Sequence, residues 1–229
     1  MIDPIHSKIE GPFLRGDRPA LLVSSTSWTQ DEDFSILLSA LQKYNAQADV
    51  NGKKLPKLLV IVTGKGPLRN KYMTEVAELQ KKWDWVRCIS IWLEVEDYPT
   101  LLGAADLGIS LHASSSNLDL PMKVVDMFGC ALPVCALDFS CLHELVKHEK
   151  NGLVFENAAQ LAQQIETLLT GFPNCPRLTK LRSNLLPISD RTTSPPTHEI
   201  SDDVWESWDE NWARHVRPLI LQDFRRDEI

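Results

Sequence analysis

Short apolar runs alternate with helix-like stretches from residue 20 to about residue 170. The runs are nearly continuous in hydrophobic residues, a pattern typical of strands that are covered on both faces. The stretches between them place apolar residues at helical spacing, as Phe34, Leu37 and Leu41 do. The pattern therefore predicts strands at residues 20–25, 57–63, 86–91, 107–111, 132–136 and 152–155.

Helices are predicted between these strands, at residues 34–44, 72–83, 98–105, 121–129 and 158–169. Before the first helix, Thr29 and Glu32 have the spacing of a capping box, in which each side chain binds the other residue's backbone N–H. Helical connections of this length require right-handed crossovers between parallel strands. We therefore expect a doubly wound, mostly parallel α/β sheet of the Rossmann-like class, with ligands bound at the carboxyl ends of the strands.

The composition and the hydrophobic periodicity of the sequence change after residue 182. Residues 186–197 are rich in proline, serine and threonine and have no hydrophobic period, which indicates a flexible linker. Farther on, Trp205, Trp208 and Trp212 share one face of a predicted helix. We expect this helix to dock back onto the domain, the alternative being a surface for a partner protein. The predicted division is an extension at 1–16, a domain at 17–182, a linker at 183–204 and the helix at 205–229.

Composition excludes several classes of function. A formal net charge of −7 argues against nucleic-acid binding, which depends on lysine and arginine at phosphates. No run of 18 apolar residues occurs, so no membrane span is predicted, and the first residues lack the pattern of a signal peptide. The cysteines are odd in number and include no Cys-x-x-Cys pair, so we expect buried thiols in a reducing compartment.

The loop after the second predicted strand contains Gly64, Lys65 and Gly66. Its glycines would let the backbone approach a diphosphate or a nucleotide at the start of the next helix. The loop has neither the third glycine of a dinucleotide fingerprint nor the spacing of a P-loop. A plain turn explains it equally well, and a nicotinamide-binding domain is disfavoured because the first strand is followed by no such fingerprint.

A second loop, after the fourth predicted strand, concentrates hydroxyl groups ahead of a helix that begins near Pro121. It contains His112 and the run 114–116, which is Ser114, Ser115 and Ser116. Hydroxyls and N–H groups at a helix N-terminus suit a phosphate, and Lys123 opposes the helix dipole unless an anion lies nearby. Asp126, one turn inside, could accept both hydroxyls of a ribose. A serine loop that caps a helix beside a solvated aspartate is the open alternative.

Other polar residues are explained more simply. His143 and Glu144 are interpreted as surface or capping residues, and Glu94, Glu96 and Asp97 as N-terminal caps of a helix. We find no convincing pair of general acid and base. No Asp-x-Asp pair lies in a loop suited to hold a metal with a sugar diphosphate.

In order, these segments resemble the carboxyl-terminal domain of GT-B-fold glycosyltransferases. The more specific resemblance is to the chitobiosyl-diphosphodolichol β-mannosyltransferase family. It covers about residues 15–182 and 205–221, and the motifs that carry it are Ser24-Ser-Thr-Ser-Trp-Thr29, Thr63-Gly-Lys-Gly-Pro-Leu-Arg69, Glu96-Asp-Tyr-Pro99, Leu118-Asp-Leu-Pro-Met-Lys-Val-Val-Asp126 and Trp208-Asp-Glu-Asn-Trp212.

The resemblance implies metal-independent, inverting transfer of mannose from GDP-mannose to lipid-linked chitobiose at the cytosolic face of the endoplasmic reticulum. The implied donor-binding residues are Ser25, Thr26, Gly64, Lys65, Gly66, His112, Ser114, Ser115, Ser116, Lys123 and Asp126. The chain departs from the family pattern at Asn117, where glycine is expected, and in residues 186–203, which look inserted. We expect it to lack the amino-terminal acceptor domain and the catalytic base. The competing hypothesis is therefore a truncated, non-enzymatic paralogue that binds GDP-mannose or a full-length mannosyltransferase.

Overall fold

The computed structural model describes residues 14–50, 55–113, 118–186 and 208–224. Its centre is a six-stranded parallel sheet in the order β3-β2-β1-β4-β5-β6. The strands are β1 (Ala20–Ser25), β2 (Leu58–Thr63), β3 (Val86–Ile91), β4 (Leu107–Ser110), β5 (Val134–Leu137) and β6 (Gly152–Phe155). The predicted fold class, a doubly wound parallel α/β sheet, is confirmed.

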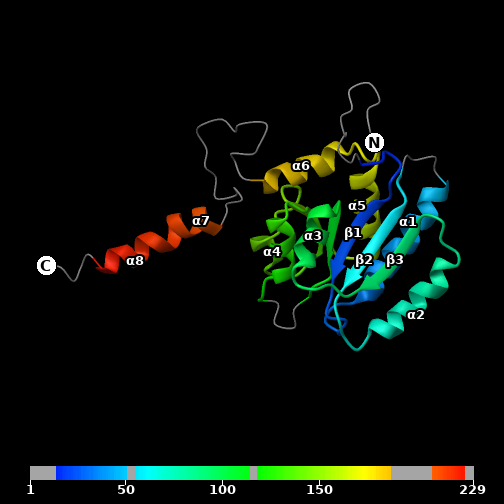
Figure 1. Ribbon diagram of the computed structural model, residues 1–229, viewed down its shortest axis with the longest axis horizontal. Helices are drawn as coiled ribbons and strands as arrows, with labels where there is room; N and C mark the ends of the chain where they lie inside the picture. The colour runs from blue at the N-terminus through cyan, green and yellow to red at the C-terminus, as the bar shows by residue number, and fades with distance from the viewer. Residues whose placement is uncertain (1–13, 51–54, 114–117, 187–207, 225–229) are drawn as a thin grey trace, which may run out of the picture.

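Helices connect the strands on both sides of the sheet (Figure 1). They are α1 (Phe34–Val50), α2 (Arg69–Gln80), α3 (Asp97–Ala104), α4 (Met122–Gly129), α5 (Ala158–Leu169) and α6 (Pro176–Leu185), with a short 3-10 turn, η1, at Leu142–Glu144. One core lies on the face of the sheet that α1, α2 and α5 cover, and it includes residues of all six strands. A second core lies on the opposite face, where α3 and α4 cover β1, β4 and β5.

Helix α6 was not predicted, and it moves the end of the domain. It begins with Pro176 at its first position, and its apolar residues Leu178, Leu181 and Leu185 are all buried. Arg182 donates a 2.6 Å hydrogen bond to the carbonyl of Ala105, which ties the helix to the loop before β4. The folded domain therefore continues past the predicted boundary at residue 182.

An ion pair closes the amino-terminal edge of the sheet. The guanidinium of Arg18 donates two hydrogen bonds, of 2.7 and 2.8 Å, to the carboxylate of Asp106. Asp106 also accepts the backbone N–H of Leu21 at 2.8 Å, so it anchors the start of β1 beside β4. This anchor fixes the two strands whose carboxyl ends flank the centre of the sheet.

The five cysteines are all free thiols. Four are buried, and Cys130, just after α4, is half-buried. Burial raises the pKa of Cys88 to about 12, and it also raises the pKa of Cys135. Buried thiols were predicted, and four of the five cysteines agree.

The carboxyl-terminal helical segment comprises α7 (Trp208–Asn211), a π-helical turn, η3 (Trp212–Val216), and α8 (Arg217–Phe224). Figure 1 shows it lying apart from the sheet and its helices. Trp208 is 71% exposed and Trp212 is 38% exposed. Docking of this segment on the domain thus stays a prediction. The predicted extension and linker fall largely outside the described residues.

Candidate functional site

The strand order reverses between the parallel neighbours β1 and β4: the chain continues from β1 to β2 and β3 on one side of the sheet, and from β4 to β5 and β6 on the other. In open α/β sheets, the crevice beyond the carboxyl ends of the strands at such a point is the usual ligand site. The loop after β1 brings Ser25 and Thr26 to this point, and the segment after β4 brings His112, Lys123 and Asp126. The loop after β2 runs alongside. Residues 114–116 of the predicted site lie outside the described residues.

Glu32 is the centre of the hydrogen-bond network at this edge. Its side chain is only 4% exposed, yet its carboxylate has four donors. The hydroxyl of Thr26 donates at 2.5 Å, and Ser27 donates from its backbone N–H at 2.6 Å and from its hydroxyl at 3.1 Å. The fourth donor is the ammonium of Lys123, 2.6 Å from Oε1. Glu32 therefore ties the loop after β1 to helix α4 across the switch point.

The electrostatics of Glu32 follow from these contacts. Burial alone would raise the pKa of Glu32, because it penalises the charged carboxylate. The hydrogen bonds from Lys123 and Thr26 outweigh burial and hold the pKa below its usual value. Glu32 is therefore a carboxylate at neutral pH, and it carries the charge that balances Lys123.

The predicted capping box is wrong. The side chain of Glu32 points into the network just described, so it caps no backbone N–H of α1. Asp33 takes that role, since its carboxylate accepts the backbone N–H of Ser35 at 2.9 Å. The interpretation of Lys123 also changes, because the anion that justifies a lysine in the first turn of α4 is Glu32 of the same chain.

The two glycines of the loop after β2 serve close packing between loops. A Cβ on Gly64 would lie 1.8 Å from the carbonyl oxygen of Thr26, and one on Gly66 would lie 1.8 Å from that of Ser27. Gly64 also has a φ of +120°, which other residues rarely adopt. The backbone N–H of Thr26 donates to the carbonyl of Thr63 at 2.9 Å. The glycines thus hold the loops after β1 and β2 together.

Ser25 belongs to a chain of hydroxyls that links β2 to α3. Its Oγ lies 2.8 Å from the hydroxyl of Tyr98 in α3 and accepts from Thr63 at 3.1 Å. Burial raises the pKa of Tyr98, and the nearby carboxylate of Asp126 raises it further. Asp126 is exposed, and none of the described residues donates a hydrogen bond to its carboxylate. Tyr98 was not among the predicted site residues.

Two basic residues and an aromatic ring lie at the carboxyl ends of β2 and β3. The ammonium of Lys65 lies 3.8 Å from the centre of the Trp92 ring, a cation–π contact. Trp92 follows β3 and is 55% exposed. Arg69, at the start of α2, donates to the hydroxyl of Ser90 at 2.9 Å. Of these, only Lys65 was a predicted site residue.

His112 lies on the other side of the crevice. Its Nε2 is 3.1 Å from a carboxylate oxygen of Asp119, and its ring meets Phe139 edge-on at 5.7 Å. These contacts orient the imidazole beside the segment that enters α4. The structure therefore brings Ser25, Thr26, Lys123 and Asp126 together, with His112 on the β4 side and Lys65 on the β2 side.

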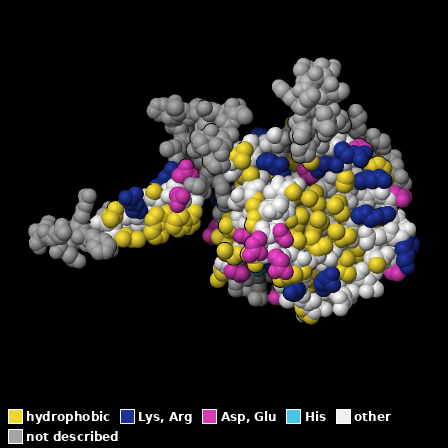
Figure 2. All heavy atoms as spheres, in the orientation of Figure 1, with side chains coloured by type: hydrophobic (Ala, Val, Ile, Leu, Met, Phe, Trp, Pro, Cys, Tyr) yellow, Lys and Arg dark blue, Asp and Glu magenta, His cyan; other side chains and the backbone are white. Residues whose placement is uncertain are grey.

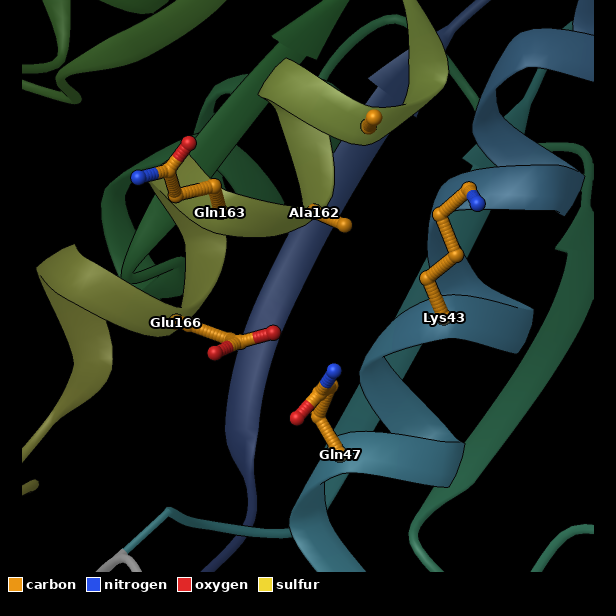
Figure 3. A pocket seen from close by; sticks show the side chains of 6 residues that line it. Lys43, Gln47, Ala162, Gln163 and Glu166 are labelled. Carbon is orange, nitrogen blue, oxygen red and sulfur yellow. The ribbon is translucent and has the colours of Figure 1, made fainter.

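A separate hollow of about 350 Å³ lies between α1 and α5 (Figure 3). Gln47 of α1 and Glu166 of α5 point toward one another across it. Lys43, Gln163 and two alanines complete its lining, so it contains none of the predicted site residues.

Within the described ranges, no three His, Cys, Asp or Glu side chains gather closely enough to hold a metal ion. The same residues include no helix that is long and apolar enough to cross a membrane. Metal-independent action stays a prediction.

An α/β domain with a cluster of polar side chains at its switch point is typical of nucleotide-binding proteins. The family model described as glycosyl transferases group 1 matches residues 18–171. The chain therefore belongs to the group 1 glycosyltransferase family.

Two curated proteins of similar sequence show which members of the family this chain resembles. The chain is 52% identical over 206 residues to the Chitobiosyldiphosphodolichol beta-mannosyltransferase of Homo sapiens, covering 90% of this chain and 40% of that protein. It is 49% identical over 156 residues to Putative glycosyltransferase ALG1L2 of Homo sapiens, covering 68% of this chain and 65% of that protein. The chain thus spans about two-fifths of the length of the first relative.

Solved structures share the fold. A crystal structure of Anabaena Alr3699/HepE with UDP-glucose aligns with a TM-score of 0.55 at 20% identity, covering 73% of this chain and 43% of that one. The resemblance proposed from the motifs is confirmed at the level of the family and of its named relatives. The individual donor-binding residues stay predictions.

Proposed function

We propose that this chain binds GDP-mannose at the crevice between β1 and β4 and belongs to an enzyme that transfers the mannose to chitobiosyl-diphosphodolichol. The observation that carries the proposal is the Glu32–Lys123 pair, with Asp126 exposed one turn farther along α4. The names of the relatives supply the sugar and the acceptor. The expected setting is the cytosolic face of the endoplasmic reticulum.

Lys123 is suited to a diphosphate although Glu32 already neutralises it. An ammonium group has three donors, and Glu32 accepts one of them at 2.6 Å. The side chain of Lys123 is 35% exposed, so the remaining donors can reach a phosphate in the crevice. The first turn of α4 adds backbone N–H groups and the positive end of the helix dipole.

Asp126 is suited to the ribose of the nucleotide. Residues three apart on a helix are neighbours, so its carboxylate lies beside Lys123 on the face of α4 that meets the crevice. Its two oxygens can accept the two ribose hydroxyls while the lysine meets the phosphates. The two side chains would thereby fix the spacing between the sugar and the diphosphate of the nucleotide.

Calorimetry tests the binding half of the proposal. GDP-mannose, GDP and UDP-glucose are titrated into the chain, each with and without a chelator. We expect GDP-mannose and GDP to bind equally well in both conditions, and UDP-glucose to bind more weakly. Binding that requires magnesium would contradict the account of the phosphate site, and preferential binding of UDP-glucose would overturn the choice of donor.

Binding without transfer is the second candidate, because the residues named above can hold a nucleotide and none of them is assigned as a general base. The chain would then bind GDP-mannose or a full-length mannosyltransferase without transferring a sugar itself. A transfer assay on chitobiosyl-diphosphodolichol separates the two functions, with the chain alone and with the remaining part of the human relative added. Transfer in either arm supports the enzyme, and binding with no transfer in both supports the second candidate.

A further inference from the structure

One face of the sheet has no helix over β2 and β3 (Figure 1). Side chains alternate between faces along a strand, and the even-numbered residues of β2 pack with α1 and α2 in the first core. The odd-numbered residues point the other way, where Figure 1 shows no helix in front of β2 and β3. The apolar members of this face are Leu59, Ile61, Ile89 and Ile91. Ile61 is buried, Leu59 and Ile91 are half-buried, and Ile89 is exposed.

The face is mostly apolar, and Arg87, the register partner of Leu59, interrupts it at one end. Ile61 of β2 pairs in register with Ile89 of β3, and Ile89 is 41% exposed. Figure 2, in the same orientation, shows hydrophobic side chains gathered over this part of the sheet. Parallel sheets occur almost only with both faces covered, because their strands are apolar on both sides. We therefore expect another part of the protein, or a partner, to cover this face.

The carboxyl-terminal helical segment has a matching unpartnered stripe. Trp208, Trp212 and Val216 recur every fourth residue, and Leu219 and Ile220 continue the same side. The two indole rings stack at 5.2 Å, and Leu219 is 63% exposed. Figure 2 shows hydrophobic side chains running along this segment. The chain thus carries an exposed apolar helix face and a partly exposed, mostly apolar sheet face.

The two faces match in size, and the chain can bring them together. From Trp208 to Ile220 the stripe is about 18 Å long at 1.5 Å per residue. The six residues of β2 or β3 extend over about 20 Å. Residues 187–207 lie between α6 and the segment and can span up to roughly 70 Å when extended.

We propose that residues 208–224 dock along β2 and β3, with Trp208 and Trp212 against Leu59, Ile89 and Ile91. The helix would then cover the face that α3 and α4 leave open. This proposal is independent of nucleotide binding, because the covered face lies beside the crevice and uses none of its residues.

Cross-linking tests the proposed docking. Cysteines are placed by Ile89→Cys and Leu219→Cys in a Cys130→Ser background, and a short bismaleimide is added at low protein concentration. We expect an intramolecular cross-link, detected by mass spectrometry of the monomer. The matched control replaces Ile89→Cys by Val95→Cys, a residue that is 82% exposed outside this face, and should cross-link at least tenfold less.

Hydrogen exchange provides a second readout that does not depend on the engineered cysteines. Amides of residues 208–224 should exchange at least tenfold more slowly in the intact chain than in the Ile89→Lys variant. The Val95→Lys variant should exchange like the intact chain. An intermolecular cross-link would show that a second copy covers the face and would overturn the proposal. Equal exchange in all three chains, or equal cross-linking in both cysteine pairs, would overturn it as well.

Discussion

The loops after β1 and β2 differ from helix α4 in how their polar groups are used. In the loops, Thr26, Ser27 and the two glycines are bonded or packed within the protein. On α4, Lys123 is only partly committed to Glu32, and Asp126 has no donor among the described residues. The comparison teaches that the loops are held by contacts within the protein, whereas α4 keeps polar groups that the proposed nucleotide site could use.

The largest effect is expected from Gly64→Ala, which tests the contacts between the loops. The new Cβ would collide with the Thr26 carbonyl oxygen at 1.8 Å, at a φ of +120°. We expect the free energy of unfolding to fall by about 3 kcal/mol or more, measured by urea denaturation. Gly103→Ala is the control, because nothing lies within 4 Å of its Cβ position. Equal stability of the two variants would show that the loops can separate freely.

Removing the charge of Glu32 should come next. Glu32→Gln leaves Lys123 without its carboxylate, and we expect a loss of roughly 2–3 kcal/mol in the free energy of unfolding. Breaking a fully buried pair costs more, but Lys123 is 35% exposed and can be hydrated. Glu78→Gln breaks the exposed pair with Lys81 and should cost less than about 0.5 kcal/mol. A loss as small as in that control would mean that the Glu32–Lys123 pair does not stabilise the fold.

Asp126→Asn tests the proposed contact between helix α4 and the ribose of the nucleotide. Asparagine keeps the shape but loses the charge and one acceptor, so GDP binding should weaken by about 1.5–3 kcal/mol in calorimetry. Stability should change by less than about 1 kcal/mol, because an exposed acid near a helix N-terminus contributes little. Asp84→Asn, an exposed aspartate just before β3, should leave binding unchanged. A destabilised variant whose folded fraction binds normally would make Asp126 structural.

The smallest effect concerns pH. The pKa of Glu32 is lowered in the folded protein, so its contribution is present above the unfolded pKa of 4.5 and is lost as pH falls through the folded pKa. The stability difference between the unmodified chain and Glu32→Gln should therefore shrink below about pH 4.5, by about 1.4 kcal/mol for each pKa unit of lowering. A difference that is constant from pH 7 to pH 3 would contradict the ionised pair.

The strands and the fold class could be predicted because both depend on local patterns. Runs such as Leu58–Thr63 are long, apolar and separated by helical periods, so their type and order follow from sequence. Helix α6 also carried a readable signal, namely Pro176 followed by leucines at helical spacing. It was missed because a single short helix stands next to a proline-rich stretch.

The site could be predicted only as a neighbourhood. Glu32 was assigned to a local capping box, whereas its partner Lys123 lies 91 residues away along the chain. A contact of that kind depends on how β1 and β4 are placed side by side, which spacing in the sequence does not encode. Tyr98 and Trp92 were missed for the same reason, since each matters through a neighbour from another loop.

The distribution of exposed and buried thiols allows the unmodified chain to be labelled at a single cysteine. Cys130 is half-buried, whereas Cys88, Cys135, Cys141 and Cys175 are buried. A maleimide dye added to the native protein should therefore mark Cys130 first, without any engineered cysteine. The labelled sulfur lies one turn beyond Asp126 on the same helix, close enough for a dye to sense the arrival of a nucleotide. Fluorescence could then follow donor binding in real time.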